Sequence, residues 1–219
     1  MLKHNQLGIK ENCEFSALDH DRLFAATASY LSFIGAVVIR RATWLARERD
    51  PYFGSLFVHM GVIFQPPALG RAKVIARPLI RIRYGNALWT ARAFEIWMFN
   101  WPKLVWSFDH FDMQARENVC PHFPARSLRT LLWYRAIGAY GPKEKAGLLK
   151  NNSHSQSHAL AGIVSYLPAK TVNAALALYS YFSRHRDSVM KLYDLSHVKT
   201  ASHLARWLAR RSRFPGTEK

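Results

Sequence analysis

The chain has 219 residues, of which 49% are hydrophobic and 13% aromatic, and this composition excludes a disordered protein. Its 31 Lys and Arg against 14 Asp and Glu give a formal net charge of +17, which indicates an anionic partner. Two cysteines, Cys13 and Cys120, are too few for a disulfide framework. No apolar run reaches the roughly 20 residues of a membrane span, and no apolar stretch follows Lys3 and His4, so we expect a cytoplasmic chain.

The first part of the chain predicts mixed helices and strands. Residues 1–18 are polar and predict a flexible segment. Asp19 predicts a helix N-cap, and the apolar, β-branched run 32–40 predicts a buried strand. Residues 42–49 predict a helix that Asp50-Pro51 ends, because the residue before a proline disfavours the helical region. A turn at 52–54, a helix at 55–64, an alternating basic strand at 73–84 and a helix at 86–99 are expected to follow.

Helical patterns dominate after Ser127, interrupted by the polar segment NNSHSQSH at 151–158. The fold class is therefore α+β followed by a mostly helical region. We expect five parts: a flexible segment at 1–18, an α+β region at 19–115, a helical connection at 116–150, a linker at 151–158 and a helical region at 159–219.

Three ordered segments carry a family resemblance: SFIGAVVIRR at 32–41, PYFGSLFVHMG at 51–61 and IRYGNALWTARAFEIWMF at 82–99. Together they resemble the acceptor-side half of a family-2 GT-A glycosyltransferase of lipopolysaccharide or capsule biosynthesis. The resemblance covers roughly residues 20 to 140. It implies transfer of a sugar from a nucleoside-diphosphate donor to a lipid-linked or saccharide acceptor, with Mg²⁺ or Mn²⁺ in a full-length homologue. The family's donor-binding strands have no counterpart here, so the chain resembles a truncated or inactive copy.

The resemblance places the catalytic carboxylate near Ser55-Leu56, where this chain has no acid. The nearest candidates are Asp50, in a loop, and His59, one turn into the next helix; either would take the proton from the acceptor hydroxyl. The alternative is structural: Asp50 as a helix-ending residue and His59 as a half-buried core residue. Asp19-His20-Asp21 has the D-x-D form of a metal-binding pair, but it follows a weak strand, which favours helix capping by Asp19.

A basic and aromatic group at a strand-to-helix junction is a candidate for binding the donor diphosphate, because guanidinium groups are bidentate donors that stay charged. Its residues are Arg81, Arg83, Asn86, Trp89 and Arg92. A solvated basic strand face is the alternative interpretation. The aromatic residues that follow, between Phe94 and Phe108, suit either a membrane boundary or simple packing.

The last predicted helix, 196–211, is amphipathic, with Val198, Leu204 and Leu208 on one face. Its basic side predicts a membrane-binding surface of Lys199, Arg206, Trp207, Arg210 and Arg211, peripheral to the inner face of the cell membrane. An ordinary packed helix is the alternative. A second function therefore stands beside the transferase: a non-catalytic basic module for an anionic membrane or nucleic acid. Nucleic acid is disfavoured, because the basic residues are spread along the chain and no recognised binding motif is present.

Overall fold

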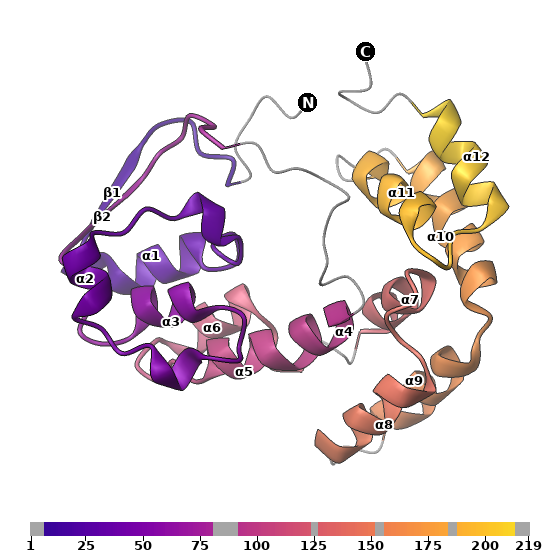
Figure 1. Cartoon of the computed structure of the whole chain (residues 1–219), viewed down its shortest axis with the longest axis horizontal. Coiled ribbons are helices and arrows are strands. Elements are labelled where there is room, and N and C mark those ends of the chain that lie inside the picture. The colour runs from indigo at the N-terminus through magenta and orange to yellow at the C-terminus, as the bar shows by residue number, and fades with distance from the viewer. Residues whose placement is uncertain (1–6, 81–91, 124–126, 152–155, 184–187, 213–219) are drawn as a thin grey trace. The chain divides into compact units, whose positions relative to one another are not determined.

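The computed structural model describes residues 7–80, 92–123, 127–151, 156–183 and 188–212 (Figure 1). The protein is α+β: mostly helical, with a single two-stranded sheet in the described part. It divides into two compact units. The N-terminal unit comprises residues 2–82 and 96–123, and the C-terminal unit comprises residues 83–95 and 124–219. None of the described helices is long and apolar enough to cross a membrane.

The sheet pairs β1 (Cys13–Ser16) with β2 (Arg71–Val74) in antiparallel register, with Cys13 opposite Val74. Phe15 is buried under the sheet, while Glu14 points outward and accepts from Lys73 Nζ at 3.1 Å. The predicted strand at 73–84 is thus wrong in extent, because the strand ends at Val74. The predicted flexible segment 1–18 is wrong too, because it contains β1. A single buried phenylalanine inside a polar run gives little periodicity to detect.

In the described residues, the N-terminal unit has five short α-helices, three 3-10 turns and one π-helical turn (Figure 1). They pack around aromatic side chains. These are η1 (Ala17–Asp19), α1 (His20–Thr27), η2 (Ile34–Ala36), α2 (Arg41–Leu45), η3 (Asp50–Tyr52), α3 (Val58–Phe64), the π-helical turn η5 (Ile96–Asn100), α5 (Trp101–Trp106) and α6 (Met113–Val119). Phe24 stacks on Phe111 with ring centroids 4.0 Å apart, and Phe57 meets Trp101 edge-on at 4.9 Å. The packing interpretation of the aromatic helices is confirmed, because Phe94, Trp101 and Phe108 are buried.

The predicted buried strand at 32–40 is wrong. This segment contains the short turn η2 and is otherwise irregular, and Ile34 and Val38 are 61% and 99% exposed. A strand needs neighbours to pair its backbone N–H and C=O groups. In the described residues β1 and β2 pair only with each other, so the apolar run at 32–40 has no sheet to join.

The C-terminal unit is helical. Its elements are α4 (Ala93–Glu95), α7 (Leu128–Ala136), α8 (Pro142–Asn151), α9 (Gln156–Tyr166), α10 (Ala169–Phe182), α11 (Ser188–His197) and α12 (His203–Arg211). Helices α7, α10, α11 and α12 pack around Ala136, Leu192, Leu195, Ala205 and Leu208. The predicted linker 151–158 overlaps the end of α8 and the start of α9, and residues 152–155 lie outside the described part of the chain.

Asn173, fully buried on α10, joins the ends of three other helices. Its amide nitrogen donates to the carbonyl of Ala136 at 3.2 Å and to that of Leu195 at 2.9 Å. Its amide oxygen accepts from the backbone nitrogen and hydroxyl of Ser202, both at 2.9 Å. Helix ends leave backbone groups unpaired, and this one side chain satisfies such groups on α7, α11 and the N-cap of α12.

Candidate functional site

The two catalytic candidates lie in different surroundings. His59 is 3% exposed, and its Nε2 donates to the carbonyl of Leu31 at 2.5 Å. Burial lowers the pKa of His59, an effect that the bond to Leu31 only partly offsets, so the ring is neutral at pH 7. Asp50 is exposed on η3. Within the described residues no hydrogen bond or ion pair joins Asp50 to His59, so the geometry gives His59 a structural role.

Asp19 occupies the predicted N-cap position of α1, but its side chain makes no capping hydrogen bond to that helix. Its carboxylate reaches back to Ser16, accepting from the backbone nitrogen at 3.0 Å and from the hydroxyl at 2.8 Å. These hydrogen bonds lower the pKa of Asp19. No cluster of three or more His, Cys, Asp or Glu side chains suited to a metal ion is found in the portion of the chain that is described.

Of the five diphosphate candidates, Arg81, Arg83, Asn86 and Trp89 lie outside the described residues. Arg92 is exposed and pairs with Glu95 through two bonds, Nε to Oε2 at 3.0 Å and a terminal nitrogen to Oε1 at 2.9 Å. This pairing lowers the pKa of the Glu95 carboxyl. An incoming phosphate would therefore compete with Glu95 for the Arg92 guanidinium.

Sequence reasoning missed a cluster of polar side chains at the carboxyl end of α3. Arg47 donates to the carbonyls of Val62 and Gln65 at 3.0 and 2.8 Å, and also to that of Pro67. Gln65 and His110 satisfy further carbonyls of α3, on Gly61 and Phe64. Cations and donors suit the carbonyl-rich end of a helix. No signal in the sequence points to this cluster, since Arg47 and His110 are distant from α3 along the chain.

The apolar face of α12 is already covered. The predicted single helix at 196–211 is wrong, because α11 ends at His197 and α12 begins at His203. Ala205, Leu208 and Ala209 of α12 are buried in the helical core, so this face is not available to insert into a bilayer. The residues predicted to bind a membrane are nevertheless exposed, four of them on α12 and Lys199 in the segment before it. We call this the basic surface: Lys199, Arg206, Trp207, Arg210 and Arg211. The Arg211 guanidinium lies over the Trp207 ring, 3.9 Å from its centroid, a cation–π contact.

Positive charge is concentrated in the unit that carries the basic surface. Residues 124–219 hold 16 of the 31 Lys and Arg but 4 of the 14 Asp and Glu, a formal net charge of +12 out of +17. Segment 198–212 contains no carboxylate. None of the four cations of the basic surface has an ion-pair partner within the described ranges. Exposed cations without local partners attract anionic ligands.

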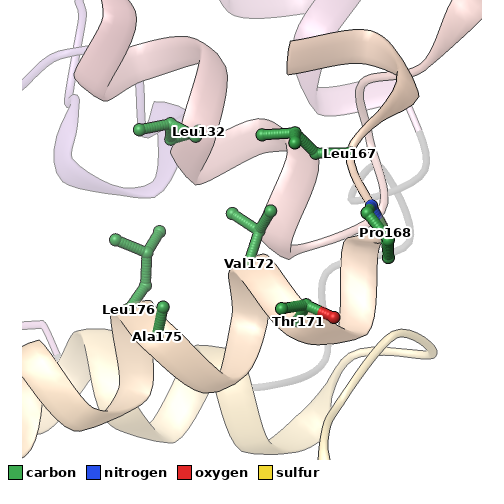
Figure 2. Close-up of a pocket in the computed structure, with 7 residues that line it drawn as sticks. All are labelled: Leu132, Leu167, Pro168, Thr171, Val172, Ala175 and Leu176. Atoms are coloured by element: carbon green, nitrogen blue, oxygen red, sulfur yellow. The ribbon is translucent and has the colours of Figure 1, made fainter. Parts of the chain in front are cut away.

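A shallow apolar groove of about 250 Å³ lies between α7 and α10 of the same unit (Figure 2). We call it the α10 groove; its lining is Leu132, Leu167, Pro168, Thr171, Val172, Ala175 and Leu176. Figure 2 shows Leu132 of α7 across the groove from Leu176 and Val172 of α10, with Leu167 and Pro168 at the opposite end. The lining surface is apolar, so the groove suits a hydrocarbon ligand.

Comparison with known proteins gives no match: no family model, no curated protein and no solved structure is similar to this chain.

Proposed function

We propose that this protein is a peripheral membrane-binding module whose C-terminal unit binds an anionic bilayer. The observation that carries the proposal is the basic surface, which presents three arginines and an exposed tryptophan on α12 and exposed Lys199 just before it, while the apolar side of α12 is buried. Each Lys or Arg near an anionic surface contributes about 1 kcal/mol. Tryptophan favours the boundary between headgroups and hydrocarbon, which distinguishes this surface from a purely ionic one.

The test is co-sedimentation of the full chain with phosphatidylglycerol or phosphatidylcholine vesicles. The triple variant Lys199→Gln, Arg206→Gln, Arg210→Gln leaves Arg211 on Trp207 and should lower the affinity for anionic vesicles roughly 100-fold. Binding of the unmodified chain should also weaken as salt rises, because salt screens exposed charges.

The matched control removes the same charge from exposed arginines of the other unit: Arg40→Gln, Arg41→Gln and Arg77→Gln. We expect this control to change vesicle binding by much less than the triple variant of the basic surface. Equal loss in the two triple variants would mean that net charge alone acts and would overturn the assignment to α12. If the triple variant of the basic surface binds vesicles as well as the unmodified chain does but no longer binds duplex DNA, the anionic partner is nucleic acid and not a membrane.

A second candidate function concerns the N-terminal unit. We propose it as the acceptor-side part of a GT-A-like sugar transferase, with a nucleoside-diphosphate sugar and a lipid-linked acceptor as substrates. The supporting observation is the exposed run around Ile34 and Val38, whose β-branched side chains suit a strand in a larger sheet. The chain alone should transfer no sugar, because the expected carboxylate position holds Leu56. Turnover in a radiolabelled transfer assay would contradict this, and then Asp50→Asn should abolish it while Asp19→Asn should not.

A further inference from the structure

Helix α1 contacts the turn at residues 108–111 through two stacked pairs of rings. His20 stacks on His110, with ring centroids 5.6 Å apart and planes inclined by 14°, and Phe24 stacks on Phe111 at 4.0 Å and 11°. His20 and Phe24 are four residues apart and so lie on the same face of α1, while His110 and Phe111 are consecutive. We call these four residues the ring cluster; one of its pairs is apolar and the other can become charged.

The imidazole of His20 lies in an aromatic part of the core without a polar partner at one of its nitrogens. Its ring centroid is 4.5 Å from that of Phe111 and 6.5 Å from that of Phe64. The Nε2 atom is buried, and within the described residues it has no hydrogen-bond partner. Buried polar atoms of native proteins nearly always have a partner, and an exception costs free energy that a phenylalanine at this position would avoid. Packing alone therefore does not explain a histidine here.

His110 differs from His20, because both of its nitrogens have a polar neighbour. Its Nε2 donates to the Phe64 carbonyl at 2.8 Å, which leaves Nδ1 as the atom that can take up a proton. Nδ1 lies 3.9 Å from Oδ1 of Asp109, an exposed carboxylate that would pair with the charged ring. A positive charge on His110 is thus accommodated, and it lies directly beside the stacked ring of His20.

The surroundings of His20 favour its neutral form. Burial lowers the pKa of His20, and the neighbouring His110 and Arg47 lower it further, while Asp21 opposes these effects only in part. Arg47 is fixed nearby by its hydrogen bonds to the carbonyl end of α3. A protonated His20 would also carry an Nε2–H in the core without an acceptor. Contact with water would remove these penalties and restore the ordinary pKa of about 6.5.

From this geometry we propose that the ring cluster is a pH-sensitive switch: it is closed while His20 is neutral, and it opens when His20 is protonated beside His110. Opening releases the amino end of α1 from the turn at 108–111 and separates Phe24 from Phe111, two rings that are buried in the closed state. The other end of α1 stays anchored, because the hydroxyl of Ser29 donates to the Val119 carbonyl at 3.2 Å. The switch lies in the N-terminal unit and does not depend on membrane binding by the C-terminal unit.

The experiment is hydrogen–deuterium exchange of the full chain at pH 7.0, 6.0 and 5.0, with exchange times corrected for the intrinsic rate at each pH. The pKa of His20 is lower in the closed state than in the open one, so opening takes up a proton. The opening equilibrium constant should therefore rise by up to about tenfold for each pH unit below about 6.5. We expect this rise in peptides that cover residues 17–27 and 107–112, and not in peptides from α10.

Two substitutions in the ring cluster test the assignment. His20→Phe keeps a ring for the stack but removes the titrating group, so it should abolish the pH dependence of exchange in both peptides. If His20→Phe does not fold, as judged by far-UV circular dichroism, His110→Gln serves instead. It keeps a donor for the Phe64 carbonyl and removes the neighbouring charge, so the rise in opening per pH unit should become smaller.

The matched control is His122→Phe, the same substitution at an exposed histidine of the same unit. The His122 ring lies on Trp106, with centroids 4.2 Å apart, and is not part of the ring cluster. This variant should keep the full pH dependence. His59→Gln removes the other buried histidine of the unit and should also keep the local opening of α1.

Three results would overturn the switch. The first is an unchanged pH dependence of exchange in folded His20→Phe. The second is an acid response of equal size in α1 and α10, which would be a general loss of stability. The third is loss of the response in His59→Gln, which would assign it to the buried histidine of α3.

Discussion

The N-terminal unit exposes apolar side chains on irregular segments as well as on helices, whereas the described part of the C-terminal unit exposes them on helices. In the N-terminal unit, exposed Val38 and Leu79 lie on irregular segments and Ile34 lies on the short turn η2, while Leu45 and Met113 are exposed on α2 and α6. In the C-terminal unit, exposed Ile163 and Tyr179 lie on the helices α9 and α10. A helix pairs its own backbone groups, whereas an irregular or extended segment depends on water or on a neighbouring chain for this.

Because of this difference, the two units suit different kinds of partner. A helical face has no unpaired backbone groups to desolvate, so it tolerates contact with lipid. An apolar segment without regular structure gains more from a strand beside it, which would pair its backbone while covering its side chains. The comparison therefore supports lipid contact by the C-terminal unit and protein contact by the N-terminal unit.

The largest predicted effect on stability concerns Asn173, the buried side chain that joins helix ends in the C-terminal unit. Replacing Asn173 by Leu should destabilise the C-terminal unit by about 3 kcal/mol, because the Leu195 carbonyl and the N-cap Ser202 lose their side-chain partner and the Ala136 carbonyl loses one of its two donors. Urea denaturation followed by far-UV circular dichroism measures this loss.

Asn118→Ala is the control for that measurement. Asn118 is exposed on α6 of the N-terminal unit, where its amide oxygen accepts from Gln114 Nε2 at 3.1 Å. An exposed substitution of this kind should shift the stability by no more than about 0.5 kcal/mol. Equal effects of the two variants would show that Asn173 does not organise its unit.

The sequence predicted the helical unit far better than the α+β unit. The helical patterns expected after Ser127 appear as helices such as α9 and α10, because 3.6-residue periodicity and local end signals are visible in the sequence of each helix. The run at 32–40 has equally clear strand composition but is not a strand, since strand formation depends on partners elsewhere in the chain. Periodicity placed Leu208 correctly on the buried face of α12, but it was wrong for Leu204, which is 36% exposed, and for Val198, which precedes the helix. It also did not reveal that the buried face is covered by other helices.

As the pH falls, the N-terminal unit should lose stability before the C-terminal unit does. Burial lowers the pKa values of His20 and His59 in the folded state, so the unfolded chain takes up these protons before the folded one. Stability is therefore lost as pH falls below about 6.5, by at most about 1.4 kcal/mol per pH unit for each histidine. In the C-terminal unit the described histidines of α11 and α12, His197 and His203, are exposed.

The measurement is proteolysis in urea at pH 7.0 and 5.5, with the fragments assigned to each unit by mass spectrometry. Fragments of the N-terminal unit should appear at lower urea at pH 5.5 than at pH 7.0. His59→Gln keeps a donor for the Leu31 carbonyl and removes the titrating ring, so it should reduce this pH dependence. A C-terminal unit that loses as much stability in acid would contradict the assignment to buried histidines.

The smallest predicted effect compares one glycine from each unit. Gly138, after α7, and Gly54, after η3, have φ of +79° and +82°, so alanine at either position costs about 1 kcal/mol in backbone strain. A Cβ at Gly138 would also come within 2.8 Å of the Thr200 methyl group, whereas at Gly54 it would meet nothing within 4 Å. Thr200 is held in place because its hydroxyl donates to the Ala136 carbonyl at 2.7 Å.

Gly138→Ala should therefore destabilise more than Gly54→Ala in thermal denaturation. The double variant Gly138→Ala, Thr200→Ser removes the methyl group but keeps the hydroxyl, so it should cost less than Gly138→Ala alone. No recovery there would mean that backbone strain alone accounts for the loss at Gly138.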